Sequence, residues 1–503
     1  MSWATTNMET INSNEIKGDK MKEVVYVPDG EINETLQLKP KDEQKKNDTW
    51  FLYLSVITAN FLMFAEGCSM VWTSPVIPQL ISNDSNINPL GEPITTIEIS
   101  LLGGIPSLFT IIGTLLFGKL PDIIGRKNTL LCVSLGMFLS NLAMSFGTYI
   151  YVFFVGRAIV QLCCGLVLAV VPIYLNEVCE DHNRAKHGCL MVFFIPFGSL
   201  YAYLVGSATS VRWFTALCGL PLLPQMVSLA LLVPESPFYT AARGDKATTI
   251  KTLRKLRRNK SDDEIEQDYL KIKTTLNAQS KAEARGLRDI FATKALRKGI
   301  FIGLGVCMCP HISGAPVVLA FLAPIFNNAG TELSGNSVGI LAGVIKLLFF
   351  FITATFVGKF GRRPLLLFSS FGAAVPLTFL GVYFYLNENN VPIVDHIRWL
   401  PILCISLFIC AYSLGLGSIP LTILSELFPN DLRSTATSFV MTIVSTVICS
   451  IITCFPLISK YLGIHYCLGL FSVCCFLDFA FIYLFLPETR GKSLLEIQNL
   501  LSK

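Results

Sequence analysis

The amino-acid sequence predicts an all-α polytopic membrane protein, with about twelve transmembrane helices in two pseudo-symmetric six-helix bundles. The first observation is composition: 52% of the 503 residues are hydrophobic and 15% are charged, whereas soluble domains carry about 25% charged residues. The second is a series of apolar runs of about 20 residues, the length that crosses a bilayer as a helix. The third is an internal repeat of charged motifs that divides these runs six and six.

The expected elements follow one another in a simple order. A polar tail of mixed charge at 1–49 lacks a signal-peptide pattern and is expected in the cytosol. The expected spans of the N-terminal bundle (50–233) are 51–72, 98–118, 129–147, 151–174, 188–206 and 213–233. Those of the C-terminal bundle (299–486) are 299–326, 338–357, 365–386, 399–424, 437–458 and 464–486. A short cytosolic tail at 487–503 completes the predicted organisation.

Positive charge predicts the orientation of the spans. Residues 51–118 contain no Lys or Arg, and the loop that follows contains Lys119, Arg126 and Lys127. Lys and Arg accumulate on the cytosolic side of a membrane, so both termini are expected there. In the long linker at 234–298, residues 243–298 contain 16 Lys and Arg against 8 Asp and Glu. This pattern predicts short amphipathic helices at the cytosolic face of the membrane and gives no support for nucleic-acid binding.

The two halves carry the same charged motifs at matching places. Gly125-Arg126-Lys127 follows the second span and Gly361-Arg362-Arg363 follows the eighth. Near the ends of the fourth and tenth spans, a Glu is followed seven residues later by an Arg, as Glu177 and Arg184 and again as Glu426 and Arg433. The sixth and twelfth spans close with Glu235 and Glu488. Repeated bundles of this kind are typical of transporters, which bind solute at the bundle interface near the bilayer midplane.

These motifs resemble those of the sugar porter family of the major facilitator superfamily over residues 51–502. The matching stretches are GKLPDIIGRK at 118–127, VGRAIVQ at 155–161, PIYLNEVCEDHNR at 172–184, PESPFYTAARG at 234–244, ISG at 312–314, GRRPLLL at 361–367, SELFPNDLR at 425–433 and PETRGKSL at 487–494. WTSPVIPQL at 72–80 looks like the branch of facilitated trehalose and glucose transporters. The resemblance implies the major facilitator fold and alternating-access transport of a hexose or trehalose-like sugar across the plasma membrane, by facilitated diffusion.

The resemblance also implies a cytosolic gate of charge-assisted pairs that holds the two bundles together. In the family, the Arg of the loop motif pairs with the Glu that ends the fourth or tenth span. The matching gate residues are Asp122, Arg126, Arg157, Glu177, Arg184 and Glu235 in one half, and Arg362, Glu426, Arg433 and Glu488 in the other. Gly358 takes the place of the acidic Asp122 in the second half. The alternative interpretation is that these are ordinary interfacial charges at helix ends.

The expected solute pathway departs from the family pattern. The seventh span of the family carries two Gln and one Asn, and Pro310, His311 and Pro316 stand at those positions here. Each sugar hydroxyl left without a partner costs about 1–3 kcal/mol, so the loss of these amides weakens hexose binding. The expected pathway residues are His311, Ser313, Lys346, Ser413 and Leu421. Two alternatives to sugar transport therefore stay open: a non-transporting nutrient sensor, and a carrier for a non-sugar, anionic solute.

Two ionisable residues lie inside expected spans. Lys346 is near the middle of the eighth, where a Lys costs at least about 2.5–3.5 kcal/mol and commonly marks a solute pathway. One interpretation is that Lys346 binds an anionic or polar solute. The alternatives are that Lys346 is neutral, that it reaches toward one membrane surface, or that it pairs with a structural carboxylate. Glu66 in the first span is a candidate proton site or a partner for Lys346. The alternative interpretation is that Glu66 is a protonated carboxyl packed against neighbouring helices.

The remaining signals concern modification and partners. Asn83-Asp84-Ser85, in the first expected extracellular loop, is an N-glycosylation sequon. Those at Asn33 and Asn47 fall in the expected cytosolic tail and should stay unmodified. No nucleophile–base pair, metal cluster or phosphate loop is recognisable, so no enzyme activity and no cofactor are expected. The expected partners are a small solute and the lipid bilayer, with a monomer as the default.

Overall fold

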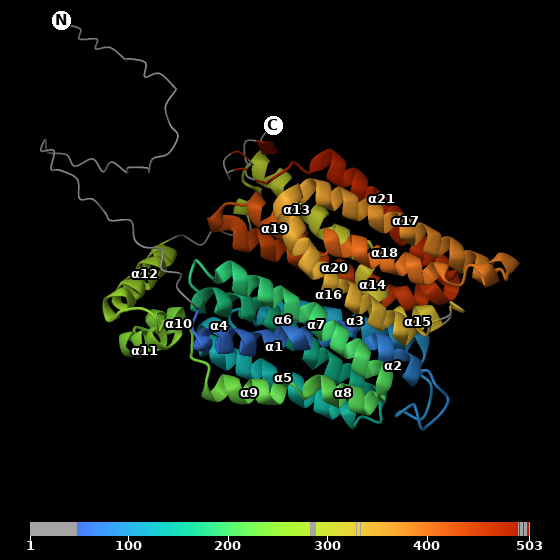
Figure 1. Cartoon of the computed structure of the whole chain (residues 1–503), viewed down its shortest axis with the longest axis horizontal. Coiled ribbons are helices and arrows are strands. Elements are labelled where there is room, and N and C mark those ends of the chain that lie inside the picture. Colours follow the sequence, from blue (N-terminus) through green and yellow to red (C-terminus); the bar gives the residue numbers. More distant parts are fainter. Residues whose placement is uncertain are drawn as a thin grey trace, which may run out of the picture. The chain divides into compact units, whose positions relative to one another are not determined.

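The computed structural model of the chain describes residues 48–281, 288–327, 329–331, 333–490, 492, 496, 500 and 501. Every regular element in these ranges is a helix, and all of them belong to one compact unit (Figure 1). The predicted all-α fold class is therefore confirmed. The folded part starts slightly before the expected end of the tail, because Thr49 caps the first helix by accepting a hydrogen bond from the backbone N–H of Leu52.

The first half of the chain supplies nine helices. They are α1 (Trp50–Val71), α2 (Thr73–Leu80), α3 (Thr96–Leu116), α4 (Leu120–Ile124), α5 (Arg126–Ser145), α6 (Ile150–Val178), α7 (Arg184–Ala208), α8 (Val211–Gly219) and α9 (Leu222–Leu231). The helix α1 matches the first expected span, α2 extends beyond its expected end at residue 72, and α8 and α9 together occupy the sixth expected span. Local capping fixes where α3 begins, since Thr95 and Glu98 form a reciprocal capping box.

The linker contains the expected short helices. They are α10 (Pro237–Ala242), α11 (Lys246–Leu256), α12 (Asp262–Lys281) and the single-turn η1 (Asp289–Phe291). Leu253, Ile265, Tyr269 and Ile272 form a small buried cluster between α11 and α12. The helices α11 and α12 therefore share a small apolar cluster of their own, whereas Leu256 of α11 and Ile290 of η1 belong to the main cluster.

The second half repeats the pattern of the first. Its helices are α13 (Lys294–Ile312), α14 (Ala315–Ala320), α15 (Leu322–Asn327), α16 (Gly335–Phe360), α17 (Arg362–Glu388), η2 (Pro392–His396), α18 (Leu400–Leu414), α19 (Pro420–Leu427), α20 (Asn430–Leu462) and α21 (Ile464–Phe485). In Figure 1 the helices of this half are coloured yellow to red, and those of the first half blue to green.

Two expected spans of the second half are not continuous helices. The seventh breaks at Gly314, whose φ of +79° suits glycine, and a Cβ there would lie 2.3 Å from the ring of Phe471. The tenth, expected at 399–424, ends as α18 and resumes as α19, which starts at Pro420. At the break, Gly415 has a non-helical backbone with a φ of −139° and a ψ of −65°, and a Cβ there would lie 2.7 Å from the carbonyl oxygen of Leu365 on α17. The prediction of one helix over 399–424 is therefore wrong.

The surface of the helices is that of a multi-pass membrane protein. In the described residues, 11 helices are long and apolar enough to cross a bilayer, and α18 is a shorter apolar helix. Large apolar side chains on them are exposed; for example, Leu116 is 74% exposed and Leu231 is 77% exposed. Exposed apolar surface on this scale is normal only where lipid covers it.

Hydrogen bonds join the two halves at one end of the helices. We call the end where α1 begins the terminal face, and the other end the opposite face. At the opposite face, Thr73 Oγ1 donates to the carbonyl oxygen of Ala320 at 2.8 Å, and Tyr203 Oη donates to that of Leu319 at 2.9 Å. Nearby, the backbone N–H of Ala323 donates to Ser74 Oγ at 3.0 Å.

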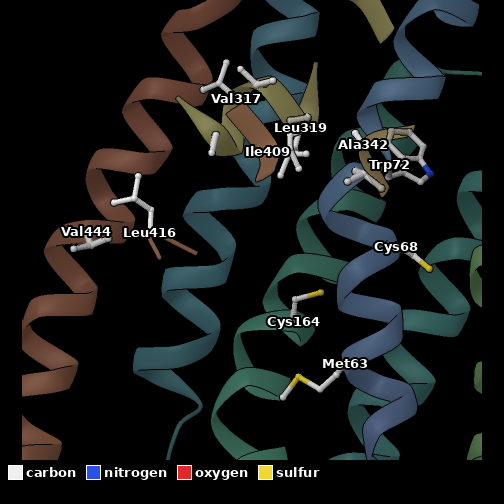
Figure 2. Packing of buried hydrophobic residues seen from close by; sticks show 14 of the residues in the cluster. Met63, Cys68, Trp72, Cys164, Val317, Leu319, Ala342, Ile409, Leu416 and Val444 are labelled. Carbon is white, nitrogen blue, oxygen red and sulfur yellow. The ribbon is translucent and has the colours of Figure 1, made fainter. Parts of the chain in front are cut away.

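Buried apolar side chains of both halves belong to one cluster. Figure 2 shows Met63, Cys68 and Trp72 along α1 and its end, Leu319 from α14 and Val444 from α20. The helices α3 and α7 of the first half pack on α20 and α16 of the second. Of the candidate pathway residues described below, Lys346 lies on one of these helices, α16.

Candidate functional site

A cluster of charged side chains lies at the terminal face of the first half. Arg126, the first residue of α5, makes two hydrogen bonds to Glu177 at the end of α6: Nε to Oε2 at 3.0 Å and Nη2 to Oε1 at 2.9 Å. Asp122 of α4 lies 3.0 Å from the same Nη2. The side chains of Arg126 and Glu177 are each 13% exposed. Two parallel bonds in a half-dry setting make this the strongest kind of side-chain ion pair.

Glu235 has a different part in the same cluster. Its Oε1 accepts from the backbone N–H groups of Arg126 at 2.9 Å and Lys127 at 3.0 Å. The carboxylate thus caps the start of α5, where the helix leaves N–H groups unpaired and its dipole favours a negative charge. Gly125, with a φ of +99°, turns the chain into this helix.

The second half contains the same arrangement. Arg362 Nη2 bonds Glu426 Oε1, and their side chains are 22% and 25% exposed. Glu488 accepts from the backbone N–H groups of Arg362 at 3.2 Å and Arg363 at 3.1 Å. Burial raises the pKa of Glu488, but the N–H donors, including that of Arg490, outweigh burial and hold the pKa below its usual range.

The pairs of Arg126 with Glu177 and of Arg362 with Glu426 each lie within one half. The expectation that they bridge the two bundles therefore needs correction. The physical reason is the loop geometry, since Gly125 and Gly361, both with positive φ, turn each Arg back onto the helices of its own half. Their direct effect is to fix the loop before α5 or α17 to the fourth or tenth span.

Two further arginines of the expected gate do not join these pairs. Arg184 Nη2 lies 3.0 Å from Asp181, and both side chains are well exposed. Arg433 has its Nε buried without a hydrogen-bond partner. Arg184 instead lines a cleft of about 800 Å³, together with Asp122, Arg126, Glu177, Tyr239 and Arg243. This cleft lies between the charged cluster of the first half and the linker helices.

Arg157 was expected with the gate residues, and the structure places it elsewhere. It is 4% exposed in the second turn of α6, where Nη1 donates to Ser69 Oγ at 2.9 Å and to its carbonyl oxygen at 3.1 Å. Its guanidinium carbon lies 5.0 Å from the ring centroid of Trp72. Because α6 runs from the opposite face to the terminal face, its first turns lie far from Glu177. The prediction for Arg157 is wrong.

Glu66 is partly exposed on α1, and its buried Oε2 has no hydrogen-bond partner among the described residues. Lys346 lies near the middle of α16 and is partly exposed. The two residues form no ion pair within 4.0 Å, so the hypothesis that Glu66 is the partner of Lys346 is not supported. Glu66 therefore remains a candidate proton site, and Glu66 is not the counter-ion of Lys346.

The other expected pathway residues have different surroundings. Ser313 is fully buried, and its Oγ donates to the carbonyl oxygen of Pro310 at 2.9 Å, so this hydroxyl stabilises the helix break. His311 Nδ1 and Ser413 Oγ are buried without hydrogen-bond partners. Leu421 is 59% exposed at the start of α19. Of the residues expected to contact solute, Ser313 is the one whose polar group is already used.

A second polar centre, which the sequence motifs do not predict, lies around Asp48 at the terminal face. Its carboxylate accepts from Asn183 Nδ2 at 2.7 Å, Lys186 Nζ at 2.9 Å and Tyr53 Oη at 3.1 Å. Burial raises the pKa of Asp48, but these hydrogen bonds outweigh burial and lower the pKa to about 2. The adjacent Thr49 donates to the carbonyl oxygen of Leu256, which ties the start of α1 to α11.

Asn83 lies in the loop between α2 and α3 and is exposed. Asn88, which is 1% exposed, holds this loop by donating to the carbonyl oxygens of Leu80, Ser82 and Glu92. The sequon therefore lies on an anchored loop at the opposite face. The asparagines of the other two sequons, Asn33 and Asn47, are outside the described residues.

The chain is similar in sequence to known proteins over most of its length. A family model described as "Sugar (and other) transporter" matches residues 34–501. The curated relative "Facilitated trehalose transporter Tret1" of Culex quinquefasciatus is 29% identical over 461 residues, which cover 92% of this chain and 87% of that protein. The protein of the same name from Bombyx mori is 29% identical over 462 residues, covering 91% and 88%.

Solved structures show the same fold. The inward open conformation of the xylose transporter XylE from E. coli aligns with a TM-score of 0.74 at 22% identity, covering 89% of this chain and 99% of that chain. The proton:xylose symporter XylE bound to 6-bromo-6-deoxy-D-glucose aligns with a TM-score of 0.67 at 22% identity. It covers 90% of this chain and all of that one.

Proposed function

The chain belongs to the sugar (and other) transporter family, and from this premise we propose that it carries a sugar across the plasma membrane by alternating access. The observation that carries the proposal is the repeat of one charged unit at the terminal face of both halves: Arg126 with Glu177, and Arg362 with Glu426. Two halves that end in equivalent units can rock against each other around a solute site between them. The proposal needs no catalytic step and no cofactor.

The contacts between the halves suggest which state the structure represents. The hydrogen bonds from Thr73 to Ala320 and from Tyr203 to Leu319 join the halves at the opposite face. The charged pairs at the terminal face each stay within one half. We therefore take this conformation as closed at the opposite face and open toward the terminal face. Transport requires breaking the hydrogen bonds at the opposite face in every cycle.

The terminal face is the cytosolic side in this proposal. Lys127 and Arg363 next to the paired arginines, and the basic helix α11, support this orientation because cytosolic loops collect Lys and Arg. Both termini are then cytosolic. Transport is facilitated diffusion, and Glu66 is the residue through which proton coupling would act if uptake depended on pH.

Uptake into liposomes that contain the purified protein tests the proposal. Labelled D-glucose and trehalose are compared with labelled L-glucose at pH 6 and pH 7.5. Saturable uptake of a D-sugar, with no uptake of L-glucose and equal rates at the two pH values, is the expected result. Failure of a folded, monodisperse protein to take up any solute would favour the non-transporting sensor.

A further inference from the structure

We infer that the transported solute carries an acidic group, such as the carboxylate of a sugar acid, and that Lys346 is its counter-ion. This inference rests on the proposed function, since it names the class of sugar that the pathway accepts. Four features of Lys346 carry it: the side of the helix on which it lies, its neighbours, the lack of a protein counter-ion, and the chemistry of the surrounding polar groups.

Lys346 lies on the inner side of α16. The exposed residues of this helix include Val344, Leu348 and Phe351, which are 38%, 57% and 56% exposed. At 100° per residue these three fall on one stripe, and Lys346 is about half a turn away from it. A Lys that reached lipid or a membrane surface would lie on the exposed stripe, and Lys346 lies on the other side of the helix. The side chain therefore belongs to the wall that faces the rest of the protein.

The neighbours of Lys346 place it where the two halves meet. Gly343 and Gly339 lie one turn and two turns before Lys346 on α16. A Cβ on Gly343 would lie 3.1 Å from Leu200, and a Cβ on Gly339 would lie 2.6 Å from the ring of Tyr203. Both of these neighbours are on α7 of the first half. After it, Phe350 packs on Phe193 of the same helix, with ring centroids 5.8 Å apart. Lys346 is thus bracketed by contacts that cross between the halves.

The ammonium group of Lys346 has no counter-ion in the part of the chain that the structure describes. Among the described residues, no carboxylate lies within 4.0 Å of Lys346 Nζ. An unpaired ammonium in a poorly hydrated site is costly, and intramembrane charges are usually paired or lie on a solute pathway. A carboxylate on the solute removes that cost on binding, whereas a neutral sugar leaves it in place. Selectivity for an acidic solute follows directly from this difference.

A neutral hydroxyl near α16 provides the hydrogen-bonding group that the hydroxyls of a sugar acid need. Two turns along α16 from Lys346, Thr353 Oγ1 donates to the carbonyl oxygen of Ser413 at 3.0 Å, which brings α18 to the same side of α16. Ser413 Oγ is buried without a partner. This hydroxyl can bond a sugar hydroxyl, while Lys346 bonds the acidic group. A charged anchor with a neutral hydrogen-bonding group suits a polyhydroxylated carboxylate better than a simple fatty or aromatic acid.

Uptake of two matched probes by liposomes containing the full-length protein tests the inference. Labelled D-glucuronate and D-glucose have the same ring and differ in the carboxylate. They are measured in the wild type, Lys346→Gln, Lys346→Arg and Lys460→Gln. Lys460 is an exposed lysine in the last turn of α20 and serves as the matched control. Thermal midpoints in detergent establish that each variant is folded.

The expected result is saturable glucuronate uptake that exceeds glucose uptake in the wild type. Lys346→Gln should lower glucuronate uptake at least tenfold and leave or raise glucose uptake, while Lys346→Arg retains glucuronate uptake and Lys460→Gln has no effect. Saturable glucose uptake without glucuronate uptake would overturn the inference and preserve the proposed function. Equal losses of both probes in Lys346→Gln would also overturn it, since they indicate a structural role. No uptake of either probe by folded wild type would overturn the inference, and trehalose uptake by the same liposomes would then decide whether the proposed function also fails.

Discussion

The carboxylate of Glu235 occupies the space that a side chain on Gly125 would need: a Cβ built on Gly125 lies 2.3 Å from Glu235 Oε2. The same residues therefore define both the turn and the cap of α5. Gly125 has a φ of +99°, which L residues rarely adopt, and Glu235 accepts the first free N–H groups of the helix. One glycine makes room for one carboxylate in each half, since Gly361 and Glu488 are related in the same way.

Gly125→Ala should lower stability more than backbone strain alone does. The unfavourable φ costs about 1–3 kcal/mol, and displacing the Glu235 carboxylate from the start of α5 adds a lost cap of about 1 kcal/mol. The thermal midpoint in detergent measures the effect. Gly244→Ala is the matched control, because Gly244 has a φ of +80° and nothing within 4 Å of its Cβ position. Equal shifts in the two variants would mean that the contact with Glu235 contributes nothing.

Arg126→Ala should destabilise the protein more than Arg362→Ala. Arg126 makes two bonds to Glu177, and each side chain is 13% exposed, so the substitution leaves a largely buried carboxylate unpaired at a cost of about 3–5 kcal/mol. Arg362 and Glu426 are 22% and 25% exposed, where solvent screens the loss. Thermal midpoints of the two variants measure the difference. The double variant Arg126→Ala/Glu177→Gln should recover part of the loss, and a larger shift in Arg362→Ala would contradict the argument.

The sequence predicted the parts of the site that depend on local pattern. The repeat marked Arg126 and Glu177 as the equivalents of Arg362 and Glu426, and the family resemblance implied that each Arg pairs with the Glu of its own half. The prediction for Arg157 is wrong because Arg157 lies near the start of the fourth span and not near its end. An even-numbered span runs back toward the terminal face, so a residue in its first turns lies at the other end. The number of spans that precede Arg157 gives the direction of its helix, and the sequence contains this information.

The surroundings of Asp48 had no comparable signal in the sequence. Its partners Asn183 and Lys186 are more than 130 residues away along the chain, and the motif at 172–184, which includes Asn183, does not indicate a contact with Asp48. The break at Gly415 was missed for a related reason. Apolar composition continues through it, and the contacts that accompany the break are made with α17. The backbone N–H of Leu416 donates to Ser369 Oγ at 3.0 Å, and a Cβ on Gly415 would lie 2.7 Å from the carbonyl oxygen of Leu365. Contacts of this kind depend on the packed structure.

Asp48→Asn should reduce stability by about 2 kcal/mol at neutral pH, because the pKa of Asp48 is lowered to about 2 from an ordinary value of 3.8. A carboxyl whose pKa is lowered by folding stabilises the protein above its unfolded pKa and loses that contribution as pH falls through the folded pKa. The wild type should therefore lose this stability between about pH 4 and pH 2, and Asp48→Asn should lose less over the same interval. Thermal midpoints across this pH range test the prediction. Asp181→Asn, whose side chain is 94% exposed, is the control and should follow the wild type.

Gly104→Ala should slow transport more than it affects folding. A Cβ on Gly104 of α3 would lie 2.0 Å from Thr453 Oγ1 of α20, so the substitution pushes apart two helices that belong to different halves. Movement between the halves is the transport step in the proposed function. Uptake rate and thermal midpoint are measured together, with Gly469→Ala as the control, since nothing lies within 4 Å of the Cβ position of Gly469. A normal uptake rate in Gly104→Ala would mean that α3 and α20 need not approach this closely.

Asn83 should carry an N-linked glycan in protein made by eukaryotic cells, because it is exposed on an anchored loop at the face proposed to be extracellular. Glycosidase treatment should then shift the wild type on a gel and leave Asn83→Gln and Ser85→Ala unchanged. Asn86→Gln is the matched control: Asn86 is exposed in the same loop but is not part of a sequon, so this variant should still shift. The result also tests orientation, since glycans are added only on the side that becomes extracellular. An unshifted wild type, alongside a reporter that is glycosylated in the same cells, would contradict a glycan at Asn83. A shift that survives in Asn83→Gln would place the modified residue elsewhere in the chain and reopen the orientation of the two termini.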